Sequence, residues 1–100
     1  MENSHLLSPD SIKEKARIIR KKIIEMNSHA GEGHTGADLS ETDILSVLYF
    51  HVLGVNAERT DDPDRDRFVL SKGHGAGGLY CTLSTAGFFD QSWLHTYLQA

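Results

Sequence analysis

Two histidines flanked by glycine are the residues of this sequence whose type and setting best suit chemistry. His34 lies in Gly33-His34-Thr35-Gly36, and His74 lies in Gly73-His74-Gly75. Glycine allows a backbone to approach a ligand closely and to adopt conformations that other residues avoid. Histidine can gain or lose a proton near neutral pH. Two such loops predict a site that handles a phosphate-type anion together with proton transfer.

The turn around His74 is the better defined of the two. The apolar run Phe68-Val69-Leu70 precedes it and predicts a buried strand, and a helical pattern begins at Ala76. A strand that leads into a helix through a glycine-rich turn presents backbone N–H groups and the positive end of the helix to an anion. We therefore expect the anion to bind at Gly73, His74 and Gly75.

The first helix is predicted from Ser8 to about Ser28. Ser8 can cap it, and Pro9 suits its first position. Its apolar residues recur in steps of four and three, so they share one buried face. These residues are Ile12, Ala16, Ile19, Ile23 and Met26. The loop that carries His34 is expected to follow, over residues 27–38.

A second helix is predicted to begin near Ser40 and to end at Gly54. Ser40 and Asp43 resemble a capping box with a shorter acid, and glycine commonly ends a helix. The apolar residues form a wide stripe, so we expect this helix to be buried on most sides. The stripe consists of Ile44, Leu45, Leu48, Val52 and Leu53, and Tyr49 and Phe50 widen it.

A third helix is predicted from Ala76 to the stop at Gly87, and Asp90 can cap a final helix. The predicted elements therefore include a single strand. A lone strand leaves its backbone N–H and C=O groups without partners. We interpret the hundred residues as a mostly helical piece of a larger α/β domain.

Composition excludes several function classes. The net charge of −4 argues against a general binder of nucleic acid or membrane surfaces. The cluster Arg17, Arg20, Lys21 and Lys22 is interpreted as the solvated face of a helix. Cys81 is the only cysteine, and no stretch has signal-peptide or membrane-span character, so a soluble cytoplasmic protein is expected. The histidines lack zinc-site spacing.

Three blocks of this sequence resemble the N-terminal part of transketolases. They are Gly33-His34-Thr35-Gly36, then Leu39-Ser40-x-x-Asp43-Ile44-Leu45-x-Val47-Leu48-Tyr49, then residues 64–74 with Ser71-Lys72-Gly73-His74. The resemblance runs from about Ile18 to Leu98. It implies that residues 1–100 are the N-terminal part of a diphosphate-binding (PP) domain, an α/β fold in which helices flank a parallel sheet. The remainder of that domain would lie outside this sequence.

The resemblance implies a transferase (EC 2.2.1 class) that moves a two-carbon ketol unit from a ketose phosphate donor to an aldose acceptor. The cofactor would be thiamine diphosphate with Mg²⁺, or with Ca²⁺ or Mn²⁺. By this resemblance, His74 with Gly73 and Gly75 binds the cofactor diphosphate, and His34 acts as a catalytic and substrate-binding residue. The family's Gly-Asp-Gly metal motif and its catalytic glutamate do not occur here, so residues beyond this chain are expected to complete the site.

The chain departs from the family pattern at Thr35, where proline is usual, and at Ala37-Asp38. We expect Thr35 and Asp38 on the substrate side, which favours a modified or sulfonated sugar over the common pentose phosphates. The implied assembly is a homodimer, or a heterotetramer with a C-terminal subunit if the enzyme is split. Two alternatives stay open: another thiamine diphosphate enzyme, such as a dehydrogenase or a deoxyxylulose-phosphate synthase, and a non-catalytic helical interaction module.

Overall fold

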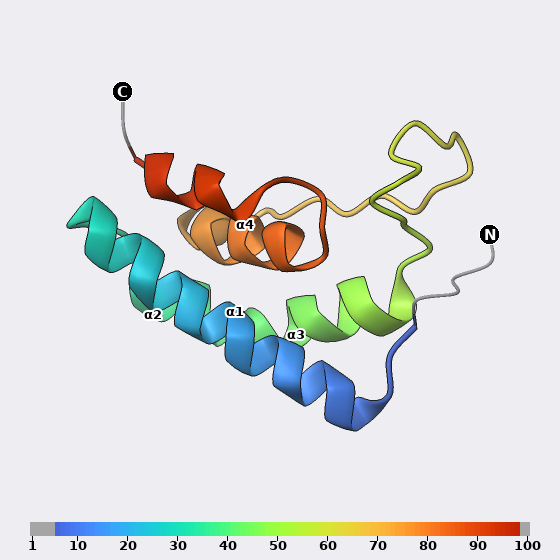
Figure 1. Ribbon diagram of the computed structural model, residues 1–100, viewed down its shortest axis with the longest axis horizontal. Helices are drawn as coiled ribbons and strands as arrows, with labels where there is room; N and C mark the ends of the chain where they lie inside the picture. The colour runs from blue at the N-terminus through green and yellow to red at the C-terminus, as the bar shows by residue number, and fades with distance from the viewer. Residues whose placement is uncertain (1–5, 99–100) are drawn as a thin grey trace.

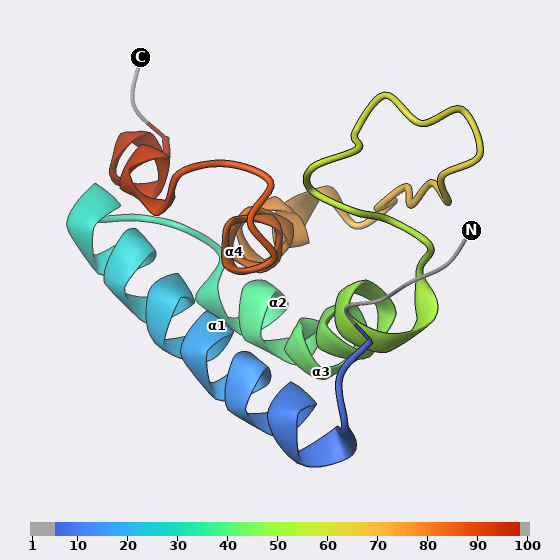
Figure 2. The ribbon, with the colours of Figure 1, turned by 45° about the vertical axis from the view of Figure 1, so that its right-hand side comes forward.

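The computed structural model describes residues 6–98 as helices joined by loops (Figure 1). In chain order the elements are α1 (Pro9–Ala30), α2 (Thr35–Ser40), α3 (Thr42–Val47), the π-helical turn η1 (Leu48–Val52), the 3₁₀ turn η2 (Gly73–Gly75), α4 (Ala76–Thr85) and the 3₁₀ segment η3 (Gln91–Thr96). The long helix α1 forms one side of the molecule, and α2, α3 and α4 pack along it (Figure 2). The segment between η1 and η2 projects from the helices.

The start of α1 confirms the predicted cap. The Ser8 hydroxyl accepts a hydrogen bond from the Ser11 N–H at 3.3 Å, and Pro9 occupies the first helical position. The helix ends at Ala30, two residues beyond the predicted end, and Gly31 closes it with a φ of +75°. Four of the five residues of the predicted apolar face are buried: Ala16, Ile19, Ile23 and Met26 are at most 4% exposed. Ile12, the fifth, is partly buried against the core.

The segment predicted as the second helix differs from that prediction in three ways. It is interrupted at Glu41, so α2 begins earlier than predicted, at Thr35, and α3 follows. Ser40 and Asp43 do not form a capping box, because the Ser40 hydroxyl donates to the Ala37 carbonyl inside α2. Asp43 instead pairs with Arg20 of α1. A hydrogen bond from the Leu53 N–H to the Leu48 carbonyl at 2.7 Å spans five residues, which makes the last turn π-helical.

The expectation that this helix is buried on most sides is wrong. Leu45, Tyr49 and Phe50 are buried, whereas Ile44 is 65% exposed and Val52 is 56% exposed. One face therefore packs on the core, and the opposite face is apolar and uncovered in the described part of the chain.

The strand predicted over residues 68–70 is not formed. Within residues 6–98 no strand occurs, and Val69 is 85% exposed in an extended segment. The physical reason is that a strand requires hydrogen-bond partners for its backbone N–H and C=O groups. The helical character of the chain is confirmed, and the parallel sheet stays a prediction.

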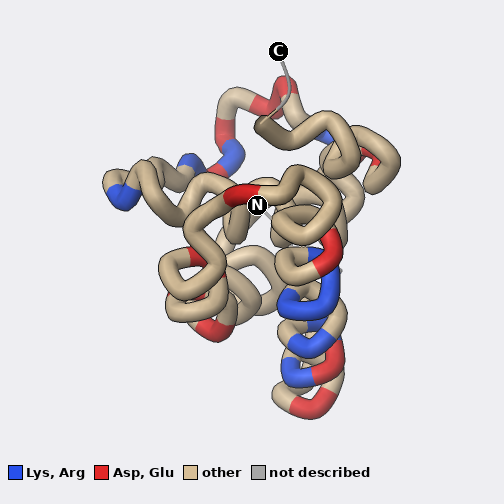
Figure 3. Tube along the Cα trace, turned by 90° about the vertical axis from the view of Figure 1, so that its left-hand side faces the viewer, with Lys and Arg blue, Asp and Glu red and all other residues tan. Residues whose placement is uncertain are grey.

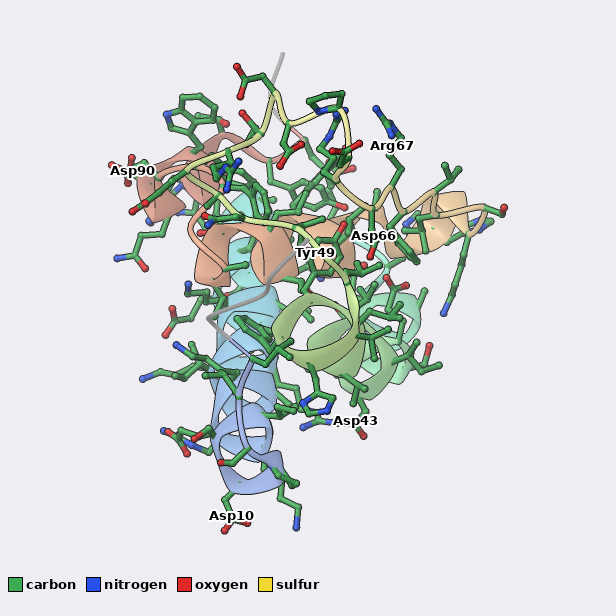
Figure 4. The ribbon with its side chains drawn as sticks, turned by 90° about the vertical axis from the view of Figure 1, so that its right-hand side faces the viewer. Asp10, Asp43, Tyr49, Asp66, Arg67 and Asp90 are labelled. Atoms are coloured by element: carbon green, nitrogen blue, oxygen red, sulfur yellow. The ribbon has the colours of Figure 1, made fainter. Side chains whose placement is uncertain are left out.

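The core lies where α1, α3, α4 and η3 meet. Its buried apolar residues are Ile19, Ile23, Met26, Leu45, Tyr49, Phe50, Val55, Cys81 and Leu94. Tyr49 makes edge-to-face contacts with Phe68 and Phe88 at 6.0 and 6.2 Å between ring centroids, and the projecting loop with Asp66 lies beside it (Figure 4). Burial raises the pKa of the Cys81 thiol to about 12, so this cysteine packs as an apolar residue.

The end of α4 and the start of η3 agree with the prediction. Gly87 has a φ of +91° just after α4. The Asp90 carboxylate accepts a hydrogen bond from the Ser92 N–H at 2.9 Å and caps η3, which is 3₁₀ rather than α-helical.

Lysines and arginines gather along α1 (Figure 3). Arg17 pairs with Glu14 on the same helix, and both side chains are more than half exposed. Such exposed pairs stabilise a fold little. The interpretation of the cluster as a solvated face is confirmed for Arg17 and Lys21, which are exposed, but it is wrong for Lys22, which is partly buried and donates to the Thr85 hydroxyl of α4 at 2.9 Å. Among residues 6–98, no helix has the length and hydropathy needed to cross a membrane.

The neighbouring isoleucines of α1 give a direct test of this packing. We expect Ile23→Ala, at a site that is 0% exposed, to lower the free energy of unfolding of the complete protein by about 2–5 kcal/mol, because it leaves a cavity. Ile24→Ala removes the same atoms at a site that is 56% exposed, and should cost less than about 1 kcal/mol. Denaturant titration measures both, and equal losses would contradict the packing described here.

Candidate functional site

The structure brings the two glycine-flanked histidines together. His34 precedes α2, and His74 lies in η2. Their rings meet edge to face, with 4.9 Å between centroids and an interplanar angle of 78°. Both side chains are exposed, so they face the same open surface. A ligand at this surface would contact both loops.

The end of α1 fixes the loop that carries His34. Gly33 has a φ of +144°, and a Cβ atom there would lie 2.5 Å from the Asn27 amide oxygen, so only glycine fits. The Asn27 side-chain nitrogen donates to the Thr35 hydroxyl at 2.9 Å and to the Asp38 carboxylate at 3.1 Å. Asn27 therefore connects the end of α1 to the start of α2, through Thr35 and Asp38.

Asp38 joins this loop to the turn of His74. Its side chain is fully buried, and Oδ1 accepts a hydrogen bond from the Gly78 N–H at 3.0 Å, in the first turn of α4. The first N–H groups of a helix lack partners within the helix and carry partial positive charge, so a carboxylate is stabilised there. The expectation that Asp38 faces a substrate is therefore wrong, because the chain's own donors occupy its carboxylate.

This contact changes where an anion can bind. The Gly78 N–H donates to Asp38, so this donor in the first turn of α4 is not available to an anion. The exposed side of the turn remains open: no atom lies within 4 Å of a Cβ atom built at Gly73, and the His74 ring is beside it. Gly75 is buried instead, where a Cβ atom would collide with the Glu41 carboxylate.

Lys72 anchors the turn to α2, a role that sequence reasoning missed. Its ammonium group donates to the Ala37 carbonyl at 3.0 Å and to the Ser40 hydroxyl at 2.6 Å. The Glu41 carboxylate lies 3.7 Å away. The only signal in the sequence was the place of Lys72 directly before the glycine turn. Because its side chain is 42% exposed, its charge also reaches the open surface.

This arrangement fits the diphosphate group of a cofactor. It offers an exposed imidazole, a partly exposed ammonium group and an open approach to the backbone at Gly73, which together suit a multiply charged anion. His34 adds a group that can hold a proton next to that anion. Among the described residues, no group of three histidine, cysteine, aspartate or glutamate side chains could hold a metal ion.

Replacing Asp38 tests whether it connects the two loops. We expect Asp38→Ala to lower the free energy of unfolding by about 2–4 kcal/mol, because inside the protein the Gly78 N–H loses its acceptor and the Asn27 amide loses one of its two acceptors. Asp43→Ala removes a carboxylate whose side chain is 77% exposed, and should cost under about 1 kcal/mol. A loss for Asp38→Ala no larger than that of the control, measured by denaturant titration, would contradict the connection.

Comparison with known proteins identifies several relatives. The chain is 48% identical over 96 residues to one subunit of the apulose-4-phosphate transketolase of Actinobacillus succinogenes, an alignment that covers 95% of this chain and 35% of that protein. It is 39% identical over 85 residues to the SqwG subunit of the 6-deoxy-6-sulfo-D-fructose transketolase of a Clostridium species, covering 85% and 31%. It is 36% identical over 97 residues to human transketolase, covering 92% and 15%.

The chain thus spans about a third of the length of the first two relatives and less of the human enzyme. The family described as "Transketolase, thiamine diphosphate binding domain" matches residues 11–96. That range contains both histidine loops, the Asp38 contact and the Lys72 anchor. The chain therefore belongs to the transketolase family, as part of its thiamine diphosphate binding domain.

Proposed function

We propose that this chain forms the diphosphate side of a transketolase active site, in an enzyme that transfers a two-carbon ketol unit from a ketose donor to an aldose acceptor. The observation that supports this most directly is the contact between the rings of His34 and His74 on one open surface, within the matched family domain. When bound, thiamine diphosphate supplies the carbon nucleophile and the electron sink for breaking the carbon–carbon bond.

Each loop has its own task in this proposal. His74 donates a ring N–H to a diphosphate oxygen, and the open space at Gly73 lets that oxygen approach the backbone. Lys72 adds positive charge while it holds the turn on α2. His34 binds the substrate hydroxyl that gains or loses a proton. The two rings are 4.9 Å apart, so a proton held by His34 would lie next to the group that would bind the diphosphate.

The complete protein is proposed to work with a second polypeptide. Two of the relatives are named as single subunits of a transketolase, which favours a split enzyme in a heterotetramer over a fused homodimer. The bound metal, proposed as Mg²⁺, would take its ligands from residues outside this sequence.

The donor is proposed to be a modified ketose and not a common pentose phosphate. The sequence departures at Thr35 and Asp38 no longer support this, because Asn27 binds both side chains and the Gly78 N–H binds Asp38. The support comes from two relatives, named for apulose 4-phosphate and for 6-deoxy-6-sulfo-D-fructose.

Replacing the two histidines separately tests their roles. In the complete protein, we expect His74→Ala to raise the Kd for thiamine diphosphate about tenfold, the size of one hydrogen bond to a charged group. His34→Ala should leave that Kd near the wild-type value and lower kcat/KM for ketol transfer by about 10²–10³. Calorimetry and a coupled rate assay measure the two quantities.

The matched control is His95→Ala, which removes an exposed histidine that contacts only the ring of His29 among the aromatic pairs described. It should change neither quantity. An unchanged Kd for His74→Ala in a folded protein would instead favour a non-catalytic helical module.

Comparing donors tests the substrate class. We expect kcat/KM with apulose 4-phosphate or 6-deoxy-6-sulfo-D-fructose to exceed that with xylulose 5-phosphate by at least about tenfold, since a site built to bind one set of polar groups rejects analogues that leave them unpaired. Comparable turnover of xylulose and ribose phosphates would overturn this proposal while leaving the ketol transfer intact.

A further inference from the structure

Glu41 is the one residue near the two histidines whose chemistry is not explained by the contacts above. It lies between α2 and α3 and is only 7% exposed. Both of its carboxylate oxygens are buried, and neither has a hydrogen-bond partner among the described residues. Burying a carboxyl group without such partners is costly, and natural proteins rarely tolerate it. A buried carboxyl group in this position therefore requires an explanation.

The carboxyl group lies directly beneath the turn that carries His74. A Cβ atom at Gly75 would collide with Oε1, and one at Gly78 would lie 3.2 Å from Oε2. Glu41 thus fills the space that a side chain at Gly75 would need. The turn contacts this carboxyl group, and Lys72 ties the turn to the end of α2.

The charged groups around Glu41 leave its carboxyl group poorly compensated. Burial raises the pKa of Glu41, and the nearby Asp38 raises it further, whereas Lys72 opposes both. Lys72 lies 3.7 Å from Oε1 but directs hydrogen bonds to Ala37 and Ser40, and α4 presents glycines at this point. A raised pKa in the folded state means that the neutral acid fits the turn better. The stability it contributes is therefore present at low pH and lost as pH rises through the pKa of Glu41.

We propose that Glu41 is a positioning residue for the diphosphate-binding turn: its carboxyl group supports Gly75 from beneath and so sets where His74 meets the cofactor. This inference rests on the proposed function for its cofactor, but the support of the turn can be measured without any cofactor.

Two substitutions in the complete protein separate shape from charge. Glu41→Gln keeps the shape of the neutral acid and cannot ionise, whereas Glu41→Ala removes the support. We expect Glu41→Ala to raise the Kd for thiamine diphosphate about tenfold. Glu41→Gln should bind at least as tightly as wild type, and the advantage of Glu41→Gln should grow between pH 5 and pH 8. Asp43→Asn removes an exposed carboxylate from α3 and should match wild type throughout.

Amide hydrogen exchange gives the readout that needs no cofactor. The Gly75 N–H donates to the Lys72 carbonyl at 2.9 Å, so its protection reports closure of the turn. We expect Glu41→Ala to lower this protection about tenfold at every pH. Wild-type protection should fall relative to Glu41→Gln as pH rises from 5 to 8, while protection at Ile19 and Ile23 in α1 stays unchanged in all variants.

The outcomes are distinguishable. Wild-type protection of Gly75 in Glu41→Ala, or the same pH dependence in Glu41→Gln and wild type, would overturn the role of Glu41 even if the cofactor binds normally. If wild type does not bind thiamine diphosphate, the proposed function fails, and the protection of Gly75 still decides whether Glu41 supports the turn.

Discussion

The buried carboxylate of Asp38 is the contact on which the geometry of the site depends. It accepts hydrogen bonds from Asn27 at the end of α1 and from Gly78 at the start of α4. Those donors belong to segments that are far apart in the chain, since Asn27 lies 11 positions before Asp38 and Gly78 lies 40 positions after it. One carboxylate thus accepts from donors on two elements at once, and loss of an acceptor inside the protein is costly. His34 and His74 extend from the two segments that it joins, and their rings meet for that reason.

Close approach of α2 to α4 also explains the glycines that follow His74. A Cβ atom at Gly77 would lie 2.7 Å from the Asp38 carboxylate, and one at Gly78 would lie 2.9 Å from the Asp38 backbone. These glycines are therefore required by the chain's own packing. Gly73 differs, because a Cβ atom there meets nothing within 4 Å. One glycine-rich motif thus combines a residue that leaves room for a ligand with residues that leave room for the neighbouring helix.

The sequence was sufficient for features that depend on local chemistry. The Ser8 cap and the buried face around Ile19 were predicted, because each follows from nearby residue types. The pairing of the two histidine loops was predicted from the likeness of their glycine-flanked histidines, although the loops are far apart in the chain. The role of Asp38 was not predicted, because an acid beside a loop looks the same whether it faces a substrate or a helix N-terminus. The strand over residues 68–70 could not form for a related reason, since its partner is absent from the described chain. Such features depend on which distant groups come together.

Asp38 and Glu41 are both buried carboxyl groups, on neighbouring turns. Asp38 stabilises the fold, whereas the ionised form of Glu41 destabilises it. Asp38 receives donors from both sides, so its charge is compensated and it holds α4 against α2. Glu41 receives none within the described chain, and its burial works against its ionised form. Residues that lower the stability of a fold are found most often at functional sites, where a fixed geometry is needed. The helix is interrupted at Glu41, and this places the side chain under Gly75 and not in solvent. Glu41 is therefore in the position that the support of the His74 turn requires.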